Sequence, residues 1–130
     1  MHLIKALAVI LAMLIPTGAM AQTLTGGEWR VVDLAGGALP EGVSPTLTFA
    51  AEGRVAGHSG CNRFTGSWAQ DGTALTFGAM ASTRMACDAP RMETETRMLE
   101  ALGTVTSVAL TPGGALEVLG PGGLIIRAVR

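Results

Sequence analysis

The side chains able to do chemistry in this 130-residue chain are concentrated in two short stretches, each containing one cysteine. Residues 57–68, GHSGCNRFTGSW, include Cys61, and residues 80–87, MASTRMAC, end at Cys87. Two cysteines of a small domain usually pair in an oxidising compartment. The two lie 26 positions apart, and closing such a loop stabilises a fold by about 3.5 kcal/mol in the chain-entropy description. We predict a structural disulfide between Cys61 and Cys87.

Two other interpretations of the cysteines stay open. They could be a buried pair of free thiols. Alternatively, Cys61 could act as a thiolate with His58 as its base, which would make the protein a thiol-redox or cysteine-dependent enzyme. His58 lies three positions before Cys61, and no acidic or amide side chain is obviously placed to orient it. The structural disulfide is therefore the favoured interpretation, and we expect no catalytic residue.

A soft metal site is a further hypothesis, because thiolate, thioether and imidazole groups suit Cu(I). Methionine more often fills irregular gaps in a core, and His58 is the only histidine after residue 2. We therefore expect neither a metal nor a cofactor. The side chains that such a site would use are His58, Cys61, Cys87, Met80, Met85, Met92 and Met98.

The polar members of the two stretches form a candidate binding surface for a peptide or an anion. They are His58, Asn62, Arg63 and Arg84. The structural alternative places Asn62 in a turn, bonded to backbone groups, and pairs Arg84 with Glu95 or with carbonyls at strand ends.

Residues 1–21 have the features of a cleaved secretory signal. A weakly positive start is followed by about ten apolar residues from Ala6, and residues 19–21, Ala-Met-Ala, fit signal peptidase. The apolar run is too short for a bilayer of about 30 Å. We predict a mature domain at residues 22–130, with no anchor cysteine after the cleavage site, in the periplasm or secreted. The alternative is an N-terminal core helix.

The charge balance argues against nucleic acid and anionic lipid as partners. Without residues 1–21 the chain has eight arginines and ten acidic residues, a net charge of −2. The arginines are scattered from Arg30 to Arg130, so no basic surface is expected.

Alternating apolar residues and glycine turns predict short antiparallel strands after residue 27. Asp88 and Pro90 are typical of a helix start and Gly103 of a helix end. The expected helix spans 91–102, with Met92, Thr96, Leu99 and Leu102 on its apolar stripe. The fold class is therefore mainly β with one amphipathic helix, in which a meander rolls into a small, partly open barrel. The expected strands are 28–34, 46–51, 54–57, 64–68, 74–77, 104–110, 115–119 and 124–129.

These motifs resemble the META domain of the heat-shock protein HslJ group. The resemblance implies a lipocalin-like barrel with a helix, usually exported or tethered to a membrane, and an association with heat or envelope stress. It implies no established activity, ligand or cofactor. The motifs are GGEW at 26–29, LTF at 47–49, GHSGCNRFTG at 57–66 and STRMAC at 82–87, with Glu95, Leu99 and Leu102.

Together, the residues and the resemblance predict a non-enzymatic envelope protein, a binding or stress-response module. We expect a monomer without a membrane span, whose partner is an envelope protein or a peptide. A carrier of small apolar ligands is a further alternative. Against a carrier, five aromatic side chains would largely fill so small a barrel. They are Trp29, Phe49, Phe64, Trp68 and Phe77.

Overall fold

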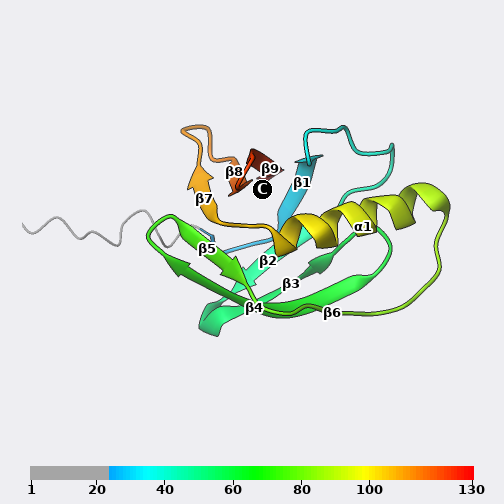
Figure 1. The fold of residues 1–130 in the computed structure, drawn as a ribbon, viewed down its shortest axis with the longest axis horizontal. Helices are drawn as coiled ribbons and strands as arrows, with labels where there is room; N and C mark the ends of the chain where they lie inside the picture. Colours follow the sequence, from blue (N-terminus) through cyan, green and yellow to red (C-terminus); the bar gives the residue numbers. More distant parts are fainter. Residues whose placement is uncertain (1–23) are drawn as a thin grey trace, which may run out of the picture.

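The computed structural model describes residues 24–130, so the predicted signal and cleavage site lie outside the described residues. Nine strands and one α-helix make up this part of the chain (Figure 1). The elements are β1 (Trp29–Leu34), β2 (Thr46–Ala50), the 3-10 turn η1 (Ala51–Gly53), β3 (Arg54–His58), β4 (Arg63–Asp71), β5 (Ala74–Phe77), β6 (Ala81–Ser82), α1 (Ala89–Gly103), β7 (Ser107–Leu110), β8 (Leu116–Gly120) and β9 (Gly123–Val129).

Eight of the strands close into an antiparallel barrel, which confirms the predicted mainly β fold class, although the barrel is closed rather than partly open. Neighbours follow the order β3-β2-β1-β9-β8-β7-β5-β4, and β3 pairs with β4 to complete the ring. The least paired seam lies between β5 and β7, where Ala74 opposite Ser107 is the single register pair. The two-residue strand β6, which the sequence did not predict, pairs with the first half of β4.

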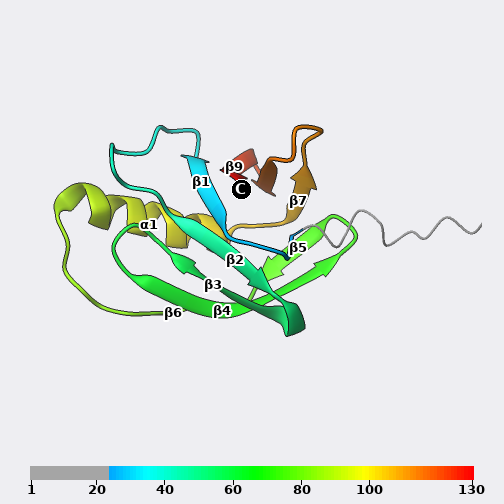
Figure 2. The same cartoon turned by 180° about the vertical axis from the view of Figure 1, so that it is seen from behind.

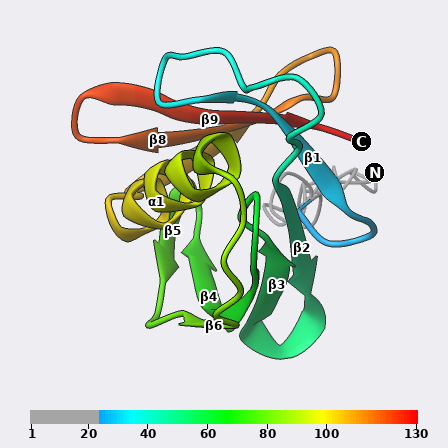
Figure 3. The same cartoon turned by 90° about the vertical axis from the view of Figure 1, so that its right-hand side faces the viewer.

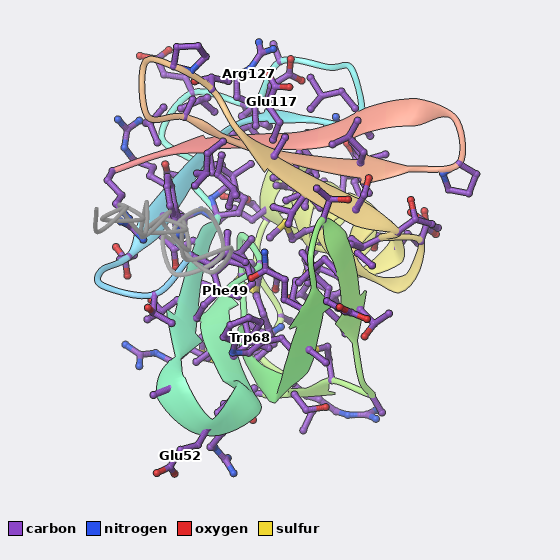
Figure 4. The ribbon with its side chains drawn as sticks, turned by 90° about the vertical axis from the view of Figure 1, so that its left-hand side faces the viewer. Phe49, Glu52, Trp68, Glu117 and Arg127 are labelled. Atoms are coloured by element: carbon purple, nitrogen blue, oxygen red, sulfur yellow. A yellow bond between two sulfur atoms is a disulfide. The ribbon has the colours of Figure 1, made fainter. Side chains whose placement is uncertain are left out.

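Aromatic and aliphatic side chains fill the inside of the barrel. Trp29, Phe49 and Phe64 are fully buried, and the Phe49 ring lies 5.2 Å from the Trp68 ring and 5.9 Å from the Phe77 ring, centroid to centroid. Figure 4 shows Phe49 and Trp68 pointing toward each other inside the strands. The prediction that these five aromatics pack in the interior is confirmed, although Trp68 and Phe77 are only partly buried.

The side chains of strand β1 do not follow the strict alternation of inward and outward residues that its sequence predicts. A strict period of two would place Leu34 on the face opposite to Trp29 and Val31. A register shift between Val31 and Asp33 against β9 inserts one extra residue, and such a bulge reverses the side on which later residues lie. Leu34 is therefore buried together with Trp29 and Val31, while Val32 is exposed.

Helix α1 begins as predicted, with the Asp88 carboxylate accepting a hydrogen bond from the Arg91 N–H. It lies between the β8–β9–β1 side of the barrel and the β2–β5 side (Figures 1 and 3). The predicted apolar stripe was wrong in part, because Met92 and Thr96 are exposed. The buried residues are Thr94, Glu95, Met98, Ala101 and Leu102. No helix in the described part of the chain has both the length and the apolar character needed to cross a membrane.

Candidate functional site

A disulfide joins Cys61 to Cys87, as predicted, with their Cα atoms 5.9 Å apart. Cys61 belongs to the connection between β3 and β4, and Cys87 lies just before α1. The Cys61 side is buried, with 3% of the residue exposed. The bridge therefore ties the barrel wall to the segment that leads into the helix.

Asn62, next to Cys61, is a buried connector between the same segments. Its Oδ1 accepts hydrogen bonds from the Met85 N–H (2.6 Å) and the Thr83 hydroxyl (3.1 Å). Its Nδ2 donates to the Met85 carbonyl (3.1 Å) and to Glu95 Oε2 (3.0 Å). The amide thus uses both its acceptor and its donor capacity. The alternative in which Asn62 bonds to backbone groups is confirmed by its two bonds to Met85, and the exposed surface position was wrong, since only 2% of the residue is exposed.

Glu95 brings the helix into this arrangement. Its Oε1 accepts hydrogen bonds from the Ser59 hydroxyl (2.6 Å) and the Asn62 N–H (2.8 Å). Burial alone would raise the pKa of the Glu95 carboxyl, but the hydrogen bonds from Ser59 and Asn62, helped by nearby His58, place that pKa below its ordinary value of 4.5. Hydrogen bonds to a charged form favour that form, so the carboxylate is buried as an anion held by neutral donors.

The side chains of Ser59, Asn62 and Glu95 are buried, whereas Thr83 and Met85 are exposed residues that bond to Asn62 through a hydroxyl and through the backbone. We call these five residues the buried polar network, after its three buried side chains. It joins the β3–β4 connection, the segment before α1 and the helix itself. Gly60 allows the close approach that this requires: with φ at +120°, a Cβ there would come within 3.3 Å of the Thr94 side chain. The suggested Arg84–Glu95 pair was wrong, because Glu95 is held by Ser59 and Asn62 while Arg84 is exposed.

A second polar region lies on the outside of the barrel, where β2, β3 and β4 run side by side (Figure 2). A hollow of about 410 Å³ opens there. We call it the outer hollow. Its lining residues are Glu28, Ser44, Thr46, Thr48, Ala56, Gly57, His58, Arg63, Phe64 and Thr65.

Strand register sets the arrangement of the outer hollow. Thr46, His58 and Arg63 lie in one row across the three strands, and each is opposite the next. The His58 N–H donates to Thr46 Oγ1 (3.2 Å), and His58 Nδ1 accepts from the Gly60 N–H (3.2 Å). A backbone N–H can only donate, so the imidazole proton of neutral His58 is on Nε2.

The four residues of the predicted binding surface therefore separate. His58 and Arg63 line the outer hollow, Asn62 is inside, and Arg84 is exposed without lining the hollow. Within residues 24–130 the Arg63 guanidinium has neither a hydrogen-bond nor an ion-pair partner. It is a cation with its donors uncommitted.

The other chemistry considered from the sequence is distributed differently. His58 Nδ1 receives the Gly60 N–H, so this nitrogen is not directed at Cys61 as a base. Of the four methionines considered as metal ligands, Met98 is fully buried and Met80 packs on the core, but Met85 is 61% exposed and Met92 36%. In the described part of the chain no three His, Cys, Asp or Glu side chains gather as metal ligands.

The sequence did not predict the roles of Ser59 and Thr83. It also did not predict the threonines that line the outer hollow near His58, which are Thr46, Thr48 and Thr65. Ser59 and Thr83 lie within the two cysteine stretches. The sequence alone does not show whether such a hydroxyl forms a hydrogen bond within the protein or with water. The outer hollow depends on which residues of β2 and β4 lie opposite β3. The turns between β2 and β3 and between β3 and β4 set the strand register. Assigning that register from the sequence would have placed these residues on one face.

Comparison with known proteins agrees with this description. The META domain family pattern matches residues 22–127. An NMR structure of a protein from Burkholderia xenovorans is 32% identical, with a TM-score of 0.66, and the match covers 85% of this chain and 86% of that one. Another NMR structure, 23% identical with a TM-score of 0.63, covers 82% and 91% and supports the fold. No curated protein matches the chain.

Proposed function

Because the chain belongs to the META domain family, we propose that it is a non-enzymatic binding module that acts in the periplasm or as a secreted protein during heat or envelope stress. The disulfide supports this location, since such bonds persist in oxidising compartments. The stress role rests on the resemblance of its motifs to the HslJ group.

The observation that carries the proposed binding role is the outer hollow. His58 and Arg63, which are paired across β3 and β4, both line it on a wall of three strands. A rigid, disulfide-linked barrel can hold such donors in place before a ligand arrives, which reduces the ordering cost of binding. The hollow is also within the size range of small-ligand sites, about 300–1,000 Å³.

The two alternatives have less support. A thiol-redox enzyme needs an accessible nucleophilic sulfur, whereas Cys61, the cysteine considered as the thiolate, is 3% exposed and only Cys87 is partly exposed. A carrier of apolar ligands needs interior space, whereas side chains from all eight barrel strands and from α1 pack together inside.

Location and thiol state test the first half of the proposal. The full chain would be expressed in a Gram-negative host, the cells fractionated, and the product examined by intact mass and thiol alkylation. We expect a periplasmic product that begins at Gln22 and has no alkylatable thiol before reduction. A cytosolic product with two reactive thiols would contradict the proposed location.

Photocrosslinking tests the binding half. A photoreactive phenylalanine would be placed at Ser44, which lines the outer hollow, and at Asp71 at the end of β4 as a matched exposed control. We expect crosslinks to an envelope component at Ser44 only, stronger after heat stress. Equal labelling from both positions would argue against the hollow as the binding surface.

A further inference from the structure

We propose that the outer hollow binds the C-terminal carboxylate of a peptide. This inference rests on the proposed binding function and adds the chemical class of the ligand. It is carried by the arrangement of charged groups and hydroxyls on the outer face of β2, β3 and β4.

The carboxylate would be held by two neighbouring donors. His58 and Arg63 are directly opposite each other in the β3–β4 ladder, and side chains so paired start from Cβ atoms about 5 Å apart. The Arg63 guanidinium can donate two parallel hydrogen bonds to a carboxylate. Since Gly60 occupies His58 Nδ1, the Nε2–H is left to donate to the same anion.

A second row of residues forms the floor and the far wall. Thr48, Ala56 and Thr65 are opposite one another across the three strands. The small Ala56 between two threonines leaves the space, and within residues 24–130 the hydroxyls of Thr48 and Thr65 have no hydrogen-bond partner. These hydroxyls can form hydrogen bonds with the peptide amide groups that precede a terminal carboxylate.

The carboxylate of Glu28 favours a peptide carboxylate over a phosphate dianion as the ligand. It also lines the hollow, and it repels a second negative charge at short range. A phosphate dianion would meet one arginine and this carboxylate, a poor balance. A peptide end carries a single planar negative charge together with N–H groups, and Glu28 can accept a hydrogen bond from such a group.

The test is an NMR titration of the purified, oxidised protein with N-acetyl-alanyl-alanine and, separately, with its C-terminal amide. We expect saturable shifts of the backbone amide signals of Thr46, His58 and Arg63 with the free carboxylate. Binding of the amidated peptide should be at least about tenfold weaker, because the charge-assisted hydrogen bonds are lost. Equal binding of both peptides, or shifts confined to other surfaces, would overturn the proposal.

Variants locate the site. Arg63→Gln should weaken binding at least about tenfold, and Ala56→Leu should weaken it by filling the floor. Arg84→Gln removes an exposed arginine that does not line the hollow, so it should leave binding unchanged. An unchanged affinity in both Arg63→Gln and Ala56→Leu would overturn the proposal, and well-dispersed spectra would show that these variants fold.

Glucuronate and inorganic phosphate serve as the competing probes. If either of them saturates the hollow while the peptide does not, the peptide assignment is wrong. A cytosolic location in the fractionation experiment would defeat the proposed function without altering this titration. Conversely, an exported, disulfide-bonded protein that fails to bind the peptide would defeat the ligand assignment alone.

Discussion

Polar side chains on the inner side of the β3–β4 connection are buried and hydrogen bonded, whereas those on its outer side line an open hollow. On the inner side Asn62 and Glu95 are buried, and their side-chain oxygens and amide are hydrogen bonded within the protein. On the outer side His58 and Arg63 line a hollow, and the Arg63 guanidinium has no hydrogen-bond or ion-pair partner among the described residues. Asn62 and Arg63 are adjacent in sequence, so one step along the chain separates a structural role from a proposed binding role.

This difference follows from the cost of leaving polar groups buried and unpaired. Such a group costs about 1–3 kcal/mol, and more when it is charged, so the inner side chains must be satisfied by the protein itself. Exposed groups on the outer face are satisfied by water and remain available to a ligand. The comparison predicts that inner substitutions change stability, whereas outer substitutions change binding.

The largest expected effect is that of Asn62→Ala. The change leaves the Met85 N–H and Glu95 Oε2 without the amide that now pairs with them. We expect a loss of about 4 kcal/mol in the free energy of unfolding, because the buried Glu95 carboxylate loses a charge-assisted bond and the part-buried Met85 backbone loses two more hydrogen bonds. Urea unfolding followed by tryptophan fluorescence measures it. A loss below about 1 kcal/mol would show that water replaces the amide and that the inner side is not closed.

The disulfide acts on the same segments by another route, because it restricts the unfolded chain. Replacing both Cys61 and Cys87 by alanine should lower the free energy of unfolding by about 3.5 kcal/mol under oxidising conditions. Under reducing conditions the wild-type protein should approach the stability of the variant. A persistent difference there would mean that the sulfurs contribute by packing rather than by cross-linking.

Glu95 gives the comparison a pH dependence. Its pKa in the folded protein lies below 4.5, so its stabilising contribution is complete above the pKa of the unfolded chain and is lost as pH falls through the lower folded value. Glu95→Gln should flatten this acid limb and, by weakening the hydrogen bonds from Ser59 and Asn62, cost about 2 kcal/mol at neutral pH. Unfolding curves between about pH 7 and pH 3 test this, with exposed Glu93→Gln as the control. An acid limb that persists in Glu95→Gln would assign it to another carboxyl.

Much of the architecture was predictable, because turn glycines and alternating apolar residues are local signals. The bounds of the helix followed from Asp88 and Gly103, and the disulfide followed from there being two cysteines. The faces were harder to predict. The bulge after Val31 depends on pairing with β9, and the inward face of α1 includes Glu95, which an apolar stripe omits.

The four residues predicted as one binding surface lie in different places because their positions also depend on contacts that are distant in sequence. Three of the four predicted residues lie within positions 58–63 and Arg84 lies in the second cysteine stretch, yet only His58 and Arg63 line one surface. Alternation along a strand places neighbours on opposite faces, but residues 59–62 lie between β3 and β4, where no simple period applies. The buried side of Asn62 is set by contacts with residues 83–95, which are distant in sequence.

The smallest expected effect on stability is that of Arg63→Gln, and it is the sharpest test of the contrast. Arg63 is exposed and its guanidinium contacts no described residue by a hydrogen bond or ion pair. The free energy of unfolding should therefore change by less than about 0.5 kcal/mol. The same urea experiment that measures Asn62→Ala gives this value. A loss above about 1 kcal/mol would make Arg63 a structural residue, and the outer face would then no longer differ from the inner one.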